Sequence, residues 1–274
     1  MGIIAIIREA FRIGRTHKSL WLFGFFVGFS GNFGTSGGGQ ESASTTAAPE
    51  PAFIALLVLI GLACIVGLVI LKFVSTGALI EGVKRARGHG SITVGEGFRE
   101  GWAHWGVLFC IALLYFAMNG ASVAVLAGVT YLAWTFFGQV AVFAVGGLAV
   151  LIGVPWLVTL YMWQAFAERI AVLENRRALD AIRKARLFLH GRLSLGLKLV
   201  VTGVLGVLFV FALALIVAGP VGVLLYSLTD FWGLFPSIAL GVLLLLPVCF
   251  VAVAMMGIMT SSVWTIGYLT QVEQ

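Results

Sequence analysis

The residues best suited to chemistry are three arginines that stand at equivalent places in a repeated pattern. The first copy runs from Glu9 to His17 (EAFRIGRTH) and the second from Glu96 to His104 (EGFREGWAH), so both contain an acid, a phenylalanine, an arginine, a glycine and a histidine in register. A third copy, from Asp180 to Ala185 (DAIRKA), keeps the acid, an apolar residue, the arginine and a small residue. Because a guanidinium fork matches phosphate oxygens, the arginines are candidate contacts for anionic headgroups: Arg12, Arg99 and Arg183.

Several roles are open for this pattern. The arginines could contact bulk anionic lipid, converge on one anionic lipid or phosphate-bearing solute, or pair with the acid three residues earlier, which is at ion-pair spacing on a helix. The equivalent histidines, His17 and His104, could bind a metal or offer polar groups at the mouths of two spans. Asn119 lies within an apolar segment, where it is either a polar group of a cavity or a hydrogen-bonding partner of a neighbouring helix.

The composition indicates an integral membrane protein. Of the 274 residues, 61% are hydrophobic and 10% are charged, whereas about 25% of the residues of a soluble domain are charged. Three long stretches contain no Asp, Glu, Lys or Arg: 104–167, 199–229 and 231–272. Each exceeds the ~20 apolar residues that span a bilayer, and helices are expected because a helix satisfies its own backbone hydrogen bonds.

The net charge of +6 is explained by membrane orientation, so no nucleic-acid partner is expected. Fifteen of the 17 Lys and Arg residues fall in three segments, 1–19, 80–105 and 168–192. Basic loops are retained on the cytoplasmic side of a membrane. The distribution predicts that these three segments and both termini are cytoplasmic.

The predicted fold is an all-α bundle of six transmembrane helices in a single transmembrane domain, 1–274. Three parallel hairpin repeats, each preceded by a cytoplasmic amphipathic elbow helix, would cover approximately 1–80, 90–168 and 175–274. Segment 34–51 is predicted to be a flexible external linker. The expected spans are 17–35, 52–76, two within 105–167 with a turn near Gly138, 193–225 and 238–264. Thr93 and Glu96 have the spacing of a capping box at the start of the second elbow helix.

The first elbow and the first span have features of their own. The elbow helix 2–18 would place its arginines at the lipid headgroups and an apolar stripe toward the acyl chains, the stripe being Ile4, Ile7, Phe11 and Gly14. The apolar run 20–33 would be only ~21 Å long as a helix, so a re-entrant segment is the alternative to a crossing. Gly24 and Gly28 have the GxxxG spacing that permits close helix approach.

A family resemblance follows from the segment His17–Gly24 (HKSLWLFG). With the short Phe-Arg helix before it and the Gly/Ser-rich stretch after it, this segment resembles the start of bacterial polytopic proteins similar to the membrane domain found beside some glycerophosphodiester phosphodiesterases. The elbow-plus-hairpin pattern extends the resemblance over most of the chain. It implies a multi-pass module of the bacterial inner membrane. The catalytic domain that accompanies the module in those enzymes has no counterpart in this sequence.

The sequence contains no recognised catalytic motif: no HExxH, nucleophile elbow, Walker loop or dinucleotide fingerprint occurs. We therefore expect no enzyme activity, no cofactor and no metal. Cys64, Cys110 and Cys249 are predicted to be small, reduced core residues. The expected function is a non-enzymatic multi-pass protein that interacts with membrane lipids through their anionic headgroups, or that organises a protein partner or a homo-oligomer. The alternative is a facilitative transporter or channel for a small solute.

Overall fold

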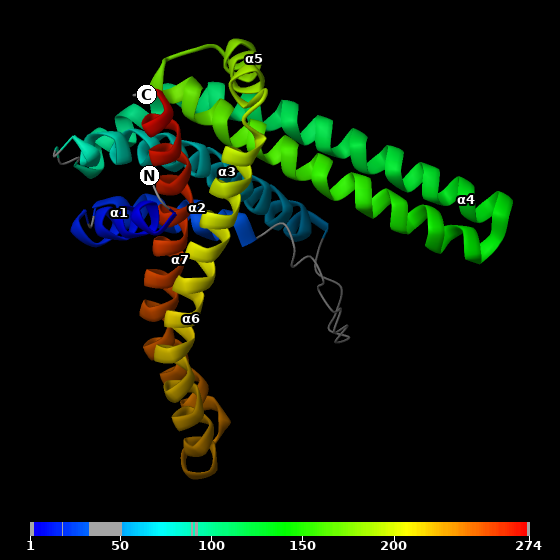
Figure 1. The fold of residues 1–274 in the computed structure, drawn as a ribbon. Helices are drawn as coiled ribbons and strands as arrows, with labels where there is room; N and C mark the ends of the chain where they lie inside the picture. Colours follow the sequence, from blue (N-terminus) through cyan, green and yellow to red (C-terminus); the bar gives the residue numbers. More distant parts are fainter. Residues whose placement is uncertain (1–2, 18, 33–50, 89, 91–92, 273–274) are drawn as a thin grey trace. The chain divides into compact units, whose positions relative to one another are not determined.

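The computed structural model describes residues 3–17, 19–32, 51–88, 90 and 93–272, and within these ranges every regular element is a helix. The helices are α1 (Ile3–Thr16), α2 (Ser19–Asn32), α3 (Pro51–Arg87), α4 (Val94–Leu173), α5 (Ala178–Leu189), α6 (Leu193–Trp232) and α7 (Leu234–Val272). Figure 1 shows that α4 doubles back on itself, so it forms two limbs of a hairpin. The all-helical architecture agrees with the prediction from composition.

Among the described residues, five helical segments are long and apolar enough to cross a membrane. They are Ala55–Arg87, Val94–Phe136, Val142–Leu173, Leu193–Ser227 and Ala239–Val272. Helix α2 has 14 residues and would reach only ~21 Å, short of a ~30 Å hydrocarbon core. A sixth crossing therefore stays a prediction. The predicted external linker, 34–51, lies outside the described residues except for Pro51, where α3 begins.

The turn between the two limbs of α4 was predicted correctly near Gly138. This glycine has φ 74° and ψ −171°, and the backbone on both sides of it is helical. That combination of dihedral angles is essentially restricted to glycine, because a Cβ atom would clash with the backbone. The residue type therefore determines where the hairpin reverses.

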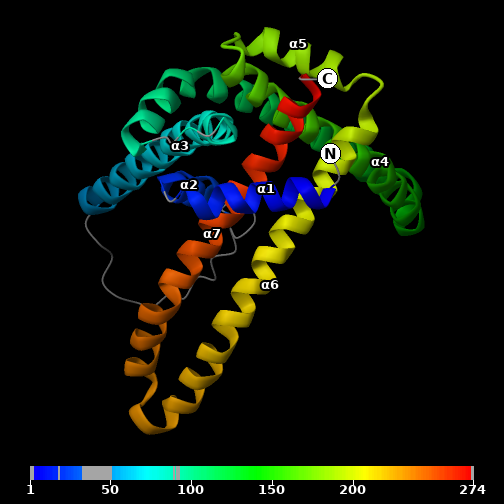
Figure 2. The same ribbon diagram turned by 60° about the vertical axis from the view of Figure 1, so that its left-hand side comes forward.

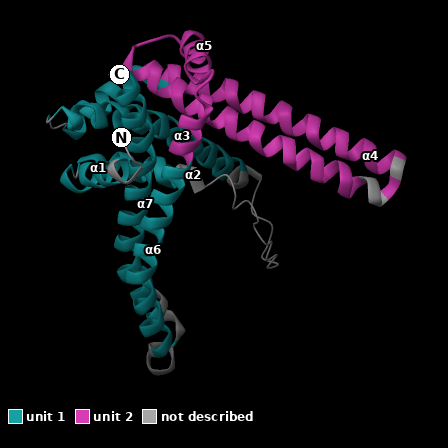
Figure 3. Cartoon of the chain, in the orientation of Figure 1, with its two compact units in different colours: residues 1–105, 201–274 teal, residues 106–200 magenta. Residues whose placement is uncertain are grey.

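The chain divides into two compact units, coloured separately in Figure 3. Unit 1 consists of 1–105 and 201–274, and unit 2 of 106–200. The limits of the units fall inside α4 and α6, so they do not coincide with the predicted repeat boundaries.

The core of unit 1 is built around the C-terminal half of α7, which packs against α1, α2 and α3. Nearly every residue from Ala254 to Tyr268 is buried. A Cβ atom added at Gly24 would overlap the Ala254 carbonyl oxygen, and one added at Gly28 would overlap that of Val253. The GxxxG pair therefore does permit close helix approach, as predicted, and α7 is the helix that it approaches.

The exposure of α7 changes abruptly along its length. Its N-terminal half carries exposed apolar side chains, Val242, Leu243, Leu244, Leu246 and Val251, whereas burial becomes almost continuous from Ala254. Helix α1 runs across the α6–α7 pair (Figure 2), and its Gly14 lies against Met255 and Ile258. Helix α1 therefore contacts α7 at the point along α7 where its side chains change from exposed to buried.

Unit 2 contains the α4 hairpin, α5 and the first turns of α6. The two limbs of α4 are joined by a hydrogen bond from Trp156 Nε1 to Ser122 Oγ at 3.0 Å. Helix α5 packs on the second limb, where the rings of Phe166 and Phe188 lie 5.2 Å apart. The packing of these two aromatic rings therefore holds the third copy of the pattern, on α5, against the second limb of α4.

The cysteines differ from their prediction. Cys64, Cys110 and Cys249 are all exposed and free, so they are not core residues. They lie on long apolar helices whose side chains are largely exposed, and a thiol behaves there as another small apolar group. An apolar run therefore did not identify the core, because in a membrane protein the exposed surface is apolar as well.

Candidate functional site

All three copies of the repeated pattern bury small residues and expose their arginines. The buried small residues are four apart in each copy: Ala10 and Gly14, Gly97 and Gly101, Ala181 and Ala185. Arg12, Arg99 and Arg183 are exposed in the same three copies. Since residues four apart lie on one face of a helix, each copy packs through a narrow face of small side chains. The sequence analysis recognised the second small residue of each pair and missed the first.

In the first copy, α1 is tied to its neighbours at its C-terminal end. Gly14 packs against Met255, and its carbonyl oxygen accepts a hydrogen bond from Trp21 Nε1 at 2.7 Å. That carbonyl is one of the last four in the helix, which have no partner within the helix. The contact fixes the turn from α1 to α2 and leaves Arg8, Arg12 and Arg15 exposed.

The apolar face of α1 differs in part from the predicted stripe. Ile6, Ala10, Ile13 and Gly14 are buried, whereas Ile7 and Phe11 are partly exposed. The predicted stripe was Ile4, Ile7, Phe11 and Gly14, of which Gly14 alone is known to be buried, while the side chain of Ile4 lies outside the described part of the chain. A second helix, α7, covers one side of α1, and the sequence of α1 alone does not show which side that is.

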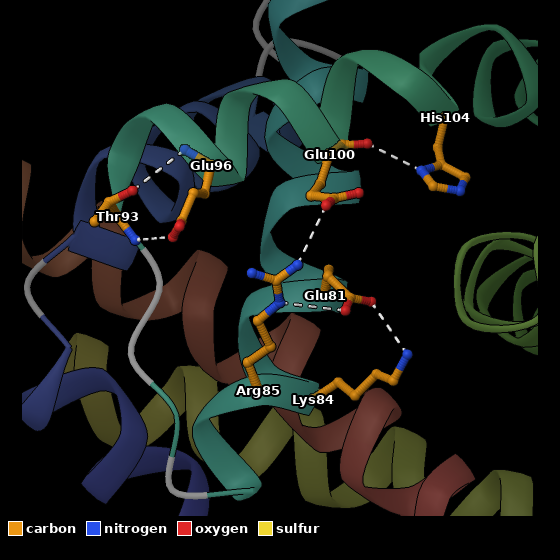
Figure 4. Close-up of polar contacts among 7 residues, drawn as sticks. All are labelled: Glu81, Lys84, Arg85, Thr93, Glu96, Glu100 and His104. Atoms are coloured by element: carbon orange, nitrogen blue, oxygen red, sulfur yellow. Dashed lines mark hydrogen bonds and ion pairs between the residues drawn. The ribbon is translucent and has the colours of Figure 1, made fainter.

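In the second copy, the start of α4 is held by a capping box, as predicted. The Thr93 backbone N–H donates to Glu96 Oε2 at 3.0 Å, and the Glu96 N–H donates to Thr93 Oγ1 at 3.4 Å (Figure 4). Reciprocal bonds of this kind satisfy two backbone donors at a helix start. They determine that α4 begins at Val94, directly after Thr93.

A charged network also joins the start of α4 to the end of α3. Arg85 Nη2 lies 3.2 Å from Glu100 Oε1, and Glu81 forms ion pairs with both Lys84 and Arg85 (Figure 4). Gly101 packs so close to α3 that a Cβ atom there would overlap the Val74 carbonyl oxygen. The network holds the second copy in place and neutralises part of the basic charge near Arg99.

In the third copy, α5 is held by a different ion pair. Lys184 Nζ lies 2.6 Å from Glu174 Oε2, just beyond the end of α4. The Arg186 guanidinium lies 5.4 Å from the centre of the Trp163 ring, within the range of a cation–π contact. The two basic residues that follow Arg183, Lys184 and Arg186, therefore contact other side chains of unit 2, while Arg183 itself is exposed.

The acid of each copy does not pair with its arginine. Within the described part of the chain, none of the ion pairs joins an acid to the arginine three residues later in the same copy. Glu96 is used in the capping box instead. The three arginines are thus accessible to a ligand or to lipid headgroups.

The side chains of His104 and Asn119 form hydrogen bonds within their own helix, whereas the hydrogen bond described for His17 belongs to its backbone. His104 Nδ1 donates to the Glu100 carbonyl oxygen at 2.9 Å, and the His17 backbone N–H donates to the Ile13 carbonyl oxygen. Asn119 Nδ2 donates to the Tyr115 carbonyl oxygen, one turn earlier in its own helix, at 2.8 Å. Among the residues that the structure describes, no three His, Cys, Asp or Glu side chains come together to hold a metal ion.

Sequence reasoning missed that Arg169 is buried and pairs with the partly exposed Glu168. Glu168 and Arg169 were taken as the start of a basic connector, but α4 continues to Leu173 and Arg169 is only 5% exposed. Its Nη1 donates to Glu168 Oε2 at 3.1 Å and to the Ala165 carbonyl oxygen at 2.8 Å. The signal was the apolar sequence Ile170–Leu173 after the pair, which extends the helix past the charges.

Comparison of the chain with protein-family models, with curated proteins and with solved structures gave no match. The resemblance to membrane domains found beside glycerophosphodiester phosphodiesterases therefore remains an expectation, and function has to be argued from the helices and their side chains.

Proposed function

We propose that this chain is a non-enzymatic multi-pass membrane protein that binds anionic lipid headgroups through the exposed arginines of its repeated pattern. The bacterial inner membrane, with both termini cytoplasmic, is the location that the charge distribution and the family resemblance favour. A membrane-embedded partner or a second copy of the chain remains compatible with this role, since much of the apolar helix surface is exposed.

The observation that carries the proposal is the shared arrangement of the three copies. In each, small residues pack against the protein and the arginine is exposed. An exposed arginine near an anionic membrane surface contributes about 1 kcal/mol of attraction. Arg99 lies near the start of the long apolar helix α4, whereas Arg12 and Arg183 lie on the short helices α1 and α5. These positions fit a protein that interacts with headgroups.

The same proposal assigns no catalytic centre to the chain. The polar side chains at the candidate positions make local structural bonds: His104 with Glu100 and Asn119 with Tyr115. We therefore propose no cofactor, no metal and no catalytic residue.

The alternative of a facilitative transporter has less support from the geometry. A cavity of about 960 Å³ between the limbs of α4 is lined, as far as the described residues show, mostly by apolar side chains, and Thr130, Tyr131 and Trp134 offer polar atoms. Asn119 is not among its lining residues. A path for a polar solute needs hydrogen-bonding groups along its wall, so lipid interaction is the better-supported function.

The test replaces the three exposed arginines together. In the triple variant R12Q/R99Q/R183Q, we expect less co-purified anionic lipid than in the parent protein, measured by native mass spectrometry of the detergent-solubilised chain. Each arginine should contribute about fivefold, the equivalent of about 1 kcal/mol.

The matched control removes three positive charges elsewhere, in the variant R176Q/R177Q/R192Q. All three of these arginines are exposed and lie outside the proposed contacts. An unchanged amount of anionic lipid in the R12Q/R99Q/R183Q protein, or the same loss in the control, would contradict the proposal.

A further inference from the structure

The geometry points to one specific lipid site in unit 1. We propose that an anionic phospholipid binds with an acyl chain in the groove between α1, α6 and α7 and with its phosphate held by Arg8 and Arg15. This inference rests on the proposed function and makes it specific, because it names the lipid class, the groove and two arginines that the repeated pattern does not single out.

The groove is an apolar recess of about 350 Å³ beside Phe11. Its walls come from Phe11 of α1, from α6 between Val210 and Val217, and from α7 between Pro247 and Met255. The short side chains of Ala214 and Ala252 leave the space open, while the Phe11 ring meets the Phe209 ring edge-on at 6.3 Å. A recess with this lining favours a hydrocarbon chain.

The shape and lining of the groove fit an acyl chain. It is an open recess between α1, α6 and α7, and its described lining side chains are all apolar. A single flexible hydrocarbon chain can lie along it without displacing α1.

Charge complementarity identifies the headgroup. Arg8 precedes Phe11 by three residues and Arg15 follows it by four, so both lie on the same face of α1 as the aromatic ring at the groove. Both arginines are exposed. Arg12, one residue from Phe11, is turned about 100° away around the helix, which makes it the less suitable of the three.

The position of the groove along α7 is also that of a membrane-surface site. Val251 is exposed, whereas Ala254 and Met255 are buried, so the groove lies where the surface of α7 passes from exposed apolar side chains into the core. Helix α1 crosses at that level (Figure 2). A lipid placed there keeps its acyl chain among apolar side chains and its phosphate beside the arginines.

The experiment measures the binding of defined lipids to the full-length, delipidated chain by native mass spectrometry. The probes are phosphatidylglycerol and phosphatidylcholine with the same acyl chains, and glycerol phosphate as a headgroup without a chain. We expect one phosphatidylglycerol to bind more tightly than phosphatidylcholine and not to be displaced by glycerol phosphate. Displacement by glycerol phosphate would show that the acyl chain is not held, and would overturn the site.

Two kinds of variant test the two halves of the site. R8Q/R15Q should weaken phosphatidylglycerol binding by about fivefold per arginine, whereas R177Q/R192Q should leave it unchanged. A214F should fill the groove and weaken the binding of both lipids, whereas A212F, at an exposed position of α6 outside the groove, should not. A252F repeats the groove test from α7 if the A214F protein unfolds at a lower temperature than the parent.

The outcomes separate this site from the general function. If R8Q/R15Q and a folded groove variant bind phosphatidylglycerol as tightly as the parent protein does, the site is overturned. The proposed function still stands in that case if R12Q/R99Q/R183Q loses anionic lipid. Equal losses of lipid binding in A214F and A212F would also overturn the site, because the lipid lost would then be bulk lipid on the protein surface. A parent protein without preference for phosphatidylglycerol over phosphatidylcholine would overturn both.

Discussion

Small residues, rather than the arginines, determine how the copies of the repeated pattern pack. Gly14 lies against Met255, Gly97 against the Phe23 ring and Gly101 against the Val74 carbonyl. Without bulky side chains, the helix backbones approach closely and gain dispersion contacts. These contacts matter in a membrane, because lipid tails are as apolar as the side chains and the hydrophobic effect does little to drive helices together. The arginines are then free to serve contacts outside the protein.

The close approach of α2 to α7 in unit 1 gives a prediction at the scale of single residues. G24L should lower the free energy of unfolding by about 1–3 kcal/mol, because its side chain would meet the Ala254 carbonyl and overpack the contact. The midpoint of thermal unfolding in detergent measures the effect. G67L is the matched control, since nothing lies within 4 Å of a Cβ atom at Gly67; similar losses in both variants would show that the contact is not the cause.

At the scale of elements, the hairpin of α4 depends on one residue. An apolar segment long enough for two spans must reverse somewhere, and it does so where Gly138 adopts φ 74°. Neighbouring glycines in the same helix, such as Gly147, have no such angle and only open space around them. Gly138 is therefore needed for its backbone freedom, whereas Gly147 weakens the helix by its flexibility.

Two alanine substitutions in α4 should consequently have opposite effects. G138A should destabilise the protein by about 1–3 kcal/mol, because alanine is strained at that combination of angles. G147A should stabilise it by about 0.5–1 kcal/mol, because alanine favours a helix interior. Thermal unfolding of the two purified variants in the same detergent compares them; stabilisation by G138A would mean that the hairpin does not reverse there.

At the scale of the whole molecule, the number of crossings depends on α2. Five helical segments are long and apolar enough to span, and α2 has 14 residues. If α2 crosses, six crossings place both termini on one side and every basic segment on that same side. If α2 re-enters, five crossings place the termini on opposite sides.

Reporter fusions in cells distinguish these topologies. From the positive-inside distribution, we expect fusions within Gly34–Pro51 to report the external side and fusions within Glu168–Arg192 to report the cytoplasm. Fusions after Val272 serve as an internal control, because six crossings place them with Glu168–Arg192. The same compartment for Gly34–Pro51 and Glu168–Arg192 would rule out the six-crossing scheme.

The sequence by itself determined which parts of the chain are helical and apolar. Uncharged stretches longer than 20 residues identified the long helices, Thr93 and Glu96 identified the start of α4, and Gly138 identified its turn. These features are local: the periodicity of a helix, reciprocal hydrogen bonds three residues apart and the unique backbone freedom of glycine are all encoded within a few residues.

Only the tertiary structure decided which apolar surface is packed against protein. Val58 and Ile258 are both apolar, yet Val58 is 64% exposed and Ile258 is fully buried. Likewise, only the structure shows that residues of α6 and α7 line a recess together with Phe11, and that Arg169 of α4 is buried. The physical reason is that lipid and protein interior are both apolar, so hydrophobicity alone cannot separate a lipid-facing side chain from a core side chain; contacts between distant segments make that distinction.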